Sequence, residues 1–293
     1  MSGEGIRGEG LWVSGLERRY PKFRLGPVSF HLPPGRALGL LGSNGAGKTT
    51  LLAGLAGQAR LQEGTVVWNG QPVRRGEWRY KHQVSFVRDV PAFYGELTVR
   101  QTMAFVARLH PTWRPERAGH LLDTFDLDPG QRVKALSRGM RAKLGLLLAA
   151  SHGVRLLLLD EVTAGIDADT RDDIQRLLRT LVAEGVAVLV SSHIFEDIEQ
   201  VSDDILILRR GAPVFSGTMS SVQHLTVAVM PVPIPSELTH SPSIVGSWNG
   251  AGETTLLIRA PLEPRVEDAL AASGSVRRAA TVRDLYFAFR ERA

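Results

Sequence analysis

The sequence predicts an α/β fold organised around a mostly parallel sheet, and three observations support that class. A glycine-rich run at 42–50 stands between a short apolar segment and a helical pattern. Four consecutive leucines at 156–159 run directly into two acidic residues. From 155 to 217, apolar strand-like segments alternate with helical ones. This alternation is typical of βαβ units, in which helices cover both faces of a parallel sheet.

The first part of the chain, 11–67, is expected to form an antiparallel β edge that leads into the glycine-rich run. Residues 37–41, Ala-Leu-Gly-Leu-Leu, predict a short buried strand just before the run. Residues 50–56 predict a helix just after it, ending at Gly57. Asn69-Gly70 predicts a hairpin turn, because both residue types adopt positive φ readily.

The glycine-rich run matches the phosphate-binding P-loop, and the strand before it and the helix after it are the flanks that this loop requires. Glycines let successive N–H groups point inward at a phosphate, at the positive end of the helix. We expect Lys48 to reach the β- and γ-phosphates and Thr49 to ligate Mg²⁺. A dinucleotide-binding fingerprint is the weaker alternative, because that fold continues with small residues here. The loop residues are Gly42, Ser43, Asn44, Gly45, Ala46, Gly47, Lys48, Thr49 and Thr50.

The leucine run predicts a strand buried on both faces, whose carboxyl end opens toward the P-loop. Asp160 at that end is the expected Mg²⁺ partner, directly or through water. Glu161, the next residue, is the expected general base that orients water against the γ-phosphate. Taken alone, the run could equally be a buried strand that ends in solvated acids.

Further motifs make residues 11–217 resemble the ATP-binding subunits of ABC transporters. The segment Leu136-Ser137-Arg138-Gly139-Met140 is similar to the family's signature motif, usually Leu-Ser-Gly-Gly-Gln. Residues 162–167 resemble the loop after the catalytic acid, and His193, after the apolar strand at 186–190, resembles the switch histidine. Tyr20 resembles the aromatic that stacks on adenine. On residues alone, His193 could instead cap a buried strand, and Tyr20 could be an ordinary core or surface aromatic.

The resemblance implies a P-loop ATPase core of ABC type over residues 1–219, with an antiparallel β subdomain and a helical subdomain at about 90–150. It implies ATP and Mg²⁺ as cofactors. It also implies a homodimer or heterodimer of nucleotide-binding subunits, in which the signature residues 136–140 of one chain contact the ATP held by the other. His193 is then a second catalytic residue that contacts the γ-phosphate.

Three departures from the family pattern bear on the expected activity. Asp89 stands where the family commonly has a glutamine that helps to bind Mg²⁺, so Asp89 is a further candidate metal ligand, although the register could be off by one. Met140 replaces the signature glutamine, and Val162 replaces a proline after the catalytic acid. We expect ATPase activity to survive the last two changes, because these positions shape loops and carry no proton.

Residues 220–293 are expected to form a small α+β accessory domain. Strands are predicted near 243–248 and 254–259, joined around Asn249-Gly250, then a helix over 263–272, a strand near 276–281 and a helix over 282–290. The proline-rich run at 230–235 should break any regular helix or central strand. The final helix resembles that of ATP-binding subunits from bacterial drug and antibiotic exporters. A packing or dimer-supporting role is expected, with a ligand sensor as the alternative.

Composition and charge limit the function classes. The chain has 293 residues and no cysteine, which excludes disulfides and thiolate metal sites. The formal charge is +5, but the basic residues are dispersed, so nucleic-acid binding is not expected. The chain lacks an apolar run long enough to cross a bilayer and the N-terminal order of a signal peptide, so a cytoplasmic location is expected.

The sequence therefore predicts an ATP-binding and ATP-hydrolysing subunit that powers transport through a separate membrane-spanning permease, at the cytoplasmic face of the membrane. Export is the expected direction, from the resemblance of the tail. Phe93 and Tyr94, at the start of the helical part, are either buried there or contact the permease. The alternatives are a soluble ABC ATPase acting on nucleic acid or ribosomes, and a catalytically weak regulatory module.

Overall fold

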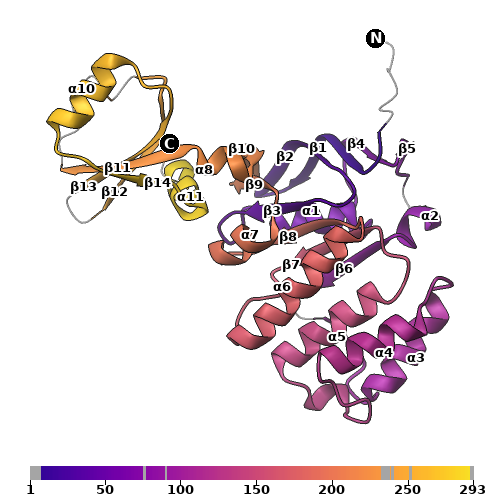
Figure 1. The fold of residues 1–293 in the computed structure, drawn as a ribbon. Coiled ribbons are helices and arrows are strands. Elements are labelled where there is room, and N and C mark those ends of the chain that lie inside the picture. The colour runs from indigo at the N-terminus through magenta and orange to yellow at the C-terminus, as the bar shows by residue number, and fades with distance from the viewer. Residues whose placement is uncertain are drawn as a thin grey trace.

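The computed structural model of the chain describes residues 8–74, 77–89, 91–231, 238, 241–250 and 253–290. Within them, one six-stranded and two four-stranded sheets are formed (Figure 1). The helical elements α3, α4 and α5 lie together at one end of the molecule, and the last sheet lies at the other end (Figure 1).

The first sheet is antiparallel, in the order β2-β1-β4-β5. The pair of residues at 69–70 joins β4 to β5 with φ values of 47° and 75°, which confirms the predicted hairpin turn. Apolar residues of this sheet pack against helix α1 and one face of the six-stranded sheet. Its strands are β1 (Leu11–Tyr20), β2 (Phe23–Leu32), β4 (Glu63–Trp68) and β5 (Gln71–Pro72).

The six-stranded sheet has the order β10-β9-β3-β8-β7-β6, with five parallel strands and β10 antiparallel at the edge. Every residue of β3, β7 and β8 is buried, as predicted for strands covered on both faces. Its strands are β3 (Ala37–Leu41), β6 (Val84–Arg88), β7 (Leu156–Asp160), β8 (Ala187–Ser191), β9 (Asp204–Arg209) and β10 (Ala212–Thr218).

The leucines of β7 show why this strand reads as an unbroken apolar run. Leu157 and Leu159 belong to the core that α5 and α6 cover. Leu156 and Leu158 belong to the core on the other face, with the first sheet and α1. Since successive side chains of a strand point to opposite faces, both faces require apolar residues. Parallel pairing of β3 and β7 through β8 brings the P-loop and Asp160 to the same edge.

The helical part follows its sequence signals closely. Helix α3 begins after a capping box formed by Thr98 and Gln101, and α4 begins at Pro115, in the first helical turn. None of the helices in the described part of the chain combines the length and apolar character that a bilayer span requires. The helices up to residue 223 are α1 (Lys48–Leu55), α2 (Trp78–Lys81), α3 (Val99–Leu109), α4 (Pro115–Thr124), α5 (Arg138–Ala150), α6 (Ala168–Ala183), α7 (Phe195–Val201) and α8 (Met219–Gln223).

The third sheet is antiparallel, in the order β12-β13-β11-β14. The predicted strands and helices are present with small shifts at their ends. The elements are β11 (Leu225–Pro231), β12 (Ile244–Gly250), β13 (Glu253–Arg259), α10 (Pro264–Ala272), β14 (Val276–Ala279) and α11 (Val282–Arg290).

In this region strand β11 was not predicted, and the turn predicted around residues 249–250 was wrong. Met230 and Pro231 end β11, which lies between two other strands and is therefore central. Pro231 pairs with Glu253 of β13, but β14 pairs only with residues 226–229, so the proline lies at the end of the strand where one side is not paired with β14. The remainder of the proline-rich run, 232–235, lies outside the described residues. Asn249 and Gly250 do not form the predicted turn between β12 and β13, since they pair with Thr254 and Glu253 inside the ladder.

Helix α11 connects the third sheet to the ATPase-like core. Leu285 and Ala288 are buried in the same apolar cluster as Ile198 of α7. The backbone N–H of Val282 donates to Glu199 Oε1 at 2.8 Å, which ties the start of α11 to α7. We retain a division near residue 219 as a proposal, based on the change of sheet between β10 and β11.

Candidate functional site

The glycine-rich loop forms one wall of a cavity of about 520 Å³ at the carboxyl ends of β3 and β7. Gly45 and Gly47 have φ values of 81° and 106°, in the left-handed region that glycine adopts without a Cβ clash. Gly42 has no room for a side chain, because a Cβ there would lie 2.6 Å from Leu208 O. The cavity is lined by Phe23, Ser43, Asn44, Gly45, Ala46, Gly47, Lys48, Thr49, Thr50 and Glu161.

Lys48, the first residue of α1, is buried with its ammonium group at this loop. Its Nζ donates to Gly42 O at 2.8 Å and forms an ion pair with Glu161 Oε1 at 3.1 Å. An ammonium without an opposite charge is costly to bury, and these contacts stabilise it. The sequence predicted that Lys48 and Glu161 serve one site, and the structure brings them into direct contact.

Glu161 joins Lys48 to His193. Its Oε2 lies 3.0 Å from His193 Nδ1 on the side opposite the lysine contact. Burial raises the pKa of Glu161, but the hydrogen bond and charge of Lys48, with a smaller contribution from His193, outweigh it and hold that pKa below its ordinary value. Glu161 is therefore ionised at neutral pH, as a general base must be.

The backbone of Glu161 is held in an unusual conformation. Its φ is 53°, in the left-handed region that few non-glycine residues adopt. Its N–H donates to Ser191 O at 3.1 Å and contacts Ser191 Oγ at 3.2 Å, so the end of β8 holds this conformation. Such strain costs about 1–3 kcal/mol and concentrates at functional sites.

Ser191 is a site residue that the sequence reasoning did not assign. Its hydroxyl donates to Asp160 Oδ1 at 2.9 Å. This hydrogen bond orients the carboxylate, and Oδ2 does not take part in it. The available signal was a serine at the end of an apolar strand just before His193. Thr49 and Asp160 supply oxygen donors, which suit Mg²⁺. Within the described residues no group of three or more His, Cys, Asp or Glu could hold a metal, so a Mg²⁺ ion here would rely on phosphate and water oxygens as well.

A second buried carboxylate, Asp197 of α7, supports the loop that carries His193. It accepts hydrogen bonds from Thr163 Oγ1 at 2.6 Å, Gln175 Nε2 at 3.0 Å and Ser192 Oγ at 3.3 Å. These partners come from the loop after Glu161, from α6 and from the end of β8. Asp197 therefore orders both loops beside the site, a role that no local sequence pattern indicated.

The structure distinguishes two aromatics near the P-loop. Tyr20 is 42% exposed and does not line the cavity, and the guanidinium carbon of Arg18 lies 4.6 Å from its ring centroid. Phe23, its partner across the β1–β2 pairing, does line the cavity. The sequence reasoning missed Phe23, although an aromatic across the turn from Tyr20 was a usable signal.

The signature residues 136–140 are absent from the cavity lining. Ser137 caps the N-terminus of α5, where its hydroxyl accepts the Met140 N–H at 3.2 Å. Arg138 forms an ion pair with Asp89, so Mg²⁺ would have to compete with a guanidinium for that carboxylate. Gly139 packs closely on α6, since a Cβ there would lie 3.0 Å from Thr170.

Comparisons with known proteins agree with this geometry. Residues 25–164 match the family described as ABC transporter. The daunorubicin resistance ATP-binding protein DrrA3 of Streptomyces coeruleorubidus is 32% identical over 219 residues, which cover 73% of this chain and 69% of that protein. The cobalt import ATP-binding protein CbiO of Salmonella paratyphi A is 33% identical over 214 residues, covering 69% of this chain and 77% of CbiO.

A solved structure described as the ATP binding subunit of an ABC transporter superposes with a TM-score of 0.68 and 26% identity, covering 73% of this chain and 92% of the other. This chain covers 66%, 57% and 61% of the length of three further relatives, which are named as ABC transporter ATP-binding proteins. The P-loop, the acids at 160–161 and the start of the signature helix α5 all lie within the matched residues 25–164. This chain belongs to the family of ABC transporter ATP-binding proteins.

Proposed function

We propose that this chain binds ATP with Mg²⁺ and hydrolyses it to power transport through a separate membrane-spanning partner. The observation that supports this most directly is the position of Glu161, between Lys48 and His193 beside the P-loop. A carboxylate, an ammonium and an imidazole thus meet where the γ-phosphate of a bound ATP would lie. The fold and the family membership support the same reading.

Each residue has a role in the proposed hydrolysis. The loop N–H groups and Lys48 bind the phosphates and offset their charge. Mg²⁺, held by Thr49 and Asp160, would neutralise charge on the β- and γ-phosphate oxygens. Glu161 accepts a proton from the attacking water, and His193 orients Glu161 and contacts the γ-phosphate. Phe23 or Tyr20 would stack on the adenine ring.

The site requires a second subunit in this proposal. Ser137 is exposed at the N-terminus of a 13-residue helix, and it does not line the P-loop cavity of its own chain. A helix N-terminus favours anionic groups through its free N–H donors and dipole. We therefore propose that Ser137 of a second copy, or of a related subunit, closes over the γ-phosphate.

The two aromatics at the start of the helical part have different environments. Phe93 is partly buried and packs against the main core. Tyr94 is 68% exposed, and its ring meets that of Phe105, itself 46% exposed, at a centroid distance of 5.9 Å. Exposed apolar side chains that lie together often mark a protein contact. We propose that Tyr94 and Phe105 contact the membrane subunit.

The direction of transport and the location of the chain are proposed from its relatives and its final helix. DrrA3 is named for drug resistance and CbiO for cobalt import, so the relatives include both directions. Export is our proposal because the final helix resembles that of drug-exporter subunits. A peripheral position at the cytoplasmic face of the membrane follows from the proposed partner.

The test is Mg²⁺-dependent ATP hydrolysis by the purified chain, with and without the membrane protein that copurifies with it. Turnover per chain should rise with protein concentration, because two chains complete each site. Retention on ribosomes or nucleic acid without a membrane partner would favour the first alternative function. Tight ATP binding with no turnover, even with the partner present, would favour a regulatory module.

A further inference from the structure

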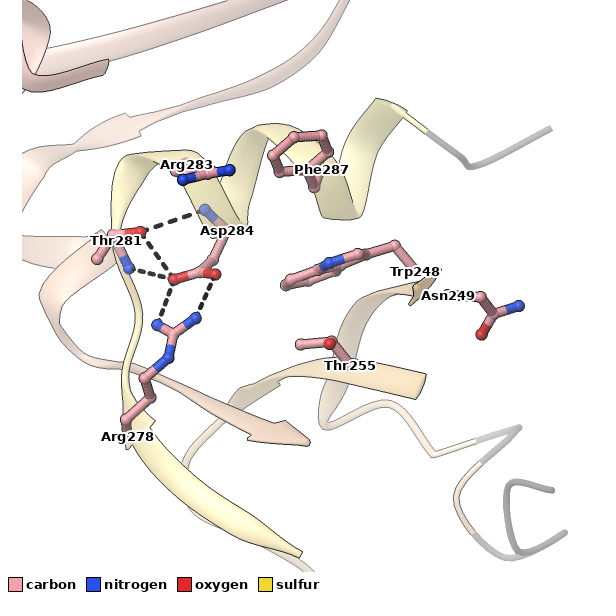
Figure 2. A pocket seen from close by; sticks show the side chains of 8 residues that line it. All are labelled: Trp248, Asn249, Thr255, Arg278, Thr281, Arg283, Asp284 and Phe287. Atoms are coloured by element: carbon pink, nitrogen blue, oxygen red, sulfur yellow. Dashed lines mark hydrogen bonds and ion pairs between the residues drawn. The ribbon is translucent and has the colours of Figure 1, made fainter. Parts of the chain in front are cut away.

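A second cavity, of about 650 Å³, lies in the C-terminal region between β12, β13, β14 and α11 (Figure 2). It shares no lining residue with the P-loop cavity. Its volume falls in the range of small-molecule sites, about 300–1,000 Å³. The lining residues are Trp248, Asn249, Thr255, Arg278, Thr281, Arg283, Asp284 and Phe287.

Two aromatic rings form the apolar wall of this cavity. Trp248 of β12 and Phe287 of α11 stack with a centroid distance of 6.5 Å and an interplanar angle of 29°. Both are only partly buried. Phe287 also lies 6.4 Å from the ring of Phe195 in α7, and Trp248 is paired in the sheet with Thr255. The wall is therefore held by two separate elements before any ligand arrives, and Figure 2 shows Trp248 between Phe287 and Thr255.

The one carboxylate of the cavity already accepts four hydrogen bonds. Asp284 accepts two hydrogen bonds from Arg278, at 2.5 and 2.7 Å, and two from Thr281, from the backbone N–H at 2.9 Å and from Oγ1 at 2.7 Å (Figure 2). Arg278 and Asp284 therefore compensate each other's charge, and Asp284 has little capacity left to attract a cation.

Arg283 leaves one positive charge in the lining uncompensated. Its guanidinium carbon lies 5.7 Å from the Phe287 centroid, and among the described residues it has no carboxylate partner. When an arginine lies over an aromatic face, the N–H donors in the plane of its guanidinium group remain available to an anion. Among the described residues, the lining thus combines flat apolar surface with one arginine that has no carboxylate partner. Arg290 lies outside the lining, but its guanidinium carbon is also 5.7 Å from the Phe287 centroid and adds positive charge beside that ring.

We propose that this cavity binds a small planar organic anion, such as an aromatic carboxylate or sulfonate. Its ring would pack on Trp248 and Phe287, and its charge would meet Arg283. A cation with the same ring would find no free carboxylate in the lining, because Asp284 is already bonded to Arg278 and Thr281. If the region had only a structural role, the cavity would not need to bind anions more tightly than cations.

The test compares two probes with the same ring and opposite charge, 2-naphthoate and 2-naphthylmethylammonium, titrated calorimetrically into the full-length chain. Naphthoate should bind saturably at one site, at least about tenfold more tightly than the ammonium probe. Arg283→Gln should weaken this preference, because it removes the arginine that lines the cavity. Trp248→Leu should weaken both probes, and Trp248→Phe, which keeps a ring, should restore part of the affinity.

Arg265→Gln is the matched control, because Arg265 lies on α10 and does not line the cavity. Its affinity for naphthoate should equal that of the unmodified chain. Equal affinity for both probes, no saturable binding at millimolar naphthoate, or unchanged binding in Arg283→Gln would each overturn the proposal. So would loss of naphthoate binding in Lys48→Ala, because the probe would then occupy the P-loop cavity.

Discussion

Arg138 of the signature motif forms an ion pair with Asp89, which directly follows β6, although 49 positions separate them in the chain. The guanidinium also borders Gly165, where a Cβ would lie 3.2 Å from it. The pair therefore ties the start of α5 to the loop after β6, beside the loop that follows Glu161. By the resemblance to the family pattern, position 138 falls at a glycine of the usual Leu-Ser-Gly-Gly-Gln and Asp89 at the expected glutamine, so the two charged side chains that stand there compensate each other.

This relationship predicts coupling between the two positions. Asp89→Gln leaves Arg138 without its partner and Arg138→Gly leaves Asp89 without its partner, so each should reduce ATP turnover about two- to fivefold. The double variant should return toward the original rate, because it has the usual pair of neutral residues. Stability should change by less than about 1 kcal/mol, since both side chains are largely exposed. Steady-state ATPase rates of the original chain, the two single variants and the double variant form a double-mutant cycle. Additive effects of the two substitutions would refute the coupling.

Glu161→Gln should slow hydrolysis about a hundredfold or more while ATP binding persists, because the amide cannot accept the proton of the attacking water. Single-turnover rates and equilibrium ATP binding measure the two effects separately. The ATP-bound protein should also accumulate as a dimer on size-exclusion chromatography. Glu196→Gln is the matched control, since Glu196 is exposed on α7 and should turn over normally. A normal rate in Glu161→Gln would remove this residue as the base.

Lys48→Ala should weaken ATP binding at least about tenfold, because the loop loses its one buried ammonium group near the phosphates. It should also raise the pKa of Glu161, since the Lys48 contact is the main influence that lowers it. ATP affinity of the variant is compared with that of Lys81→Ala, a change at an exposed lysine of α2. Equal affinities would contradict the P-loop assignment.

Two stacked histidines, His152 buried and His110 half-buried, predict that the free energy of unfolding depends on pH. His152 is 4% exposed, its Nε2 lies 2.7 Å from Ser85 Oγ, and its ring stacks on His110 at 4.0 Å. Burial, followed by the nearby charges of His110 and His82, lowers the pKa of His152 to about 4. Burial likewise lowers the pKa of His110. The folded chain thus holds both rings neutral.

The sign of the effect follows from these directions. An unfolded histidine titrates near pH 6.5, so the contribution of His152 is complete above about 6.5 and is lost as the pH falls toward 4. The loss should be on the order of 3 kcal/mol. Denaturant unfolding at pH 7.0 and 4.5 measures it. His152→Asn should flatten this dependence, whereas His120→Asn, at an exposed position, should keep it. An unaltered dependence in His152→Asn would exclude this histidine as the cause.

Helix α11 should unfold together with the ATPase-like core, because they share one apolar cluster. Leu285→Ala, at a fully buried position, should lower the free energy of unfolding by about 2–5 kcal/mol. Leu109→Ala is the same change at a position that is 56% exposed, and it should cost less than about 0.5 kcal/mol. Chemical denaturation should show one transition in both variants. A separate early transition in Leu285→Ala would show that the C-terminal region folds independently.

Much of the fold could be predicted because its signals are local. The strand over 156–159 and the helix over 282–290 matched closely, since burial on both faces and helical periodicity are visible in a few adjacent residues. The central strand β11 was missed, because the proline-rich run beginning at Pro231 masked an otherwise apolar strand. Its position depends on pairing with β13 and β14, which local pattern does not reveal.

By itself, the sequence determined the glycine-rich loop, the acids at the end of β7 and the serine-led helix, because glycine conformation, strand burial and helix capping act over a few residues. Only the tertiary structure decided which distant side chains meet. It brought Ser191 to Asp160 and Arg138 to Asp89, and it placed Trp248 on Phe287 beside an open cavity. These contacts follow from strand order and helix docking, which emerge when the whole chain buries its apolar surface.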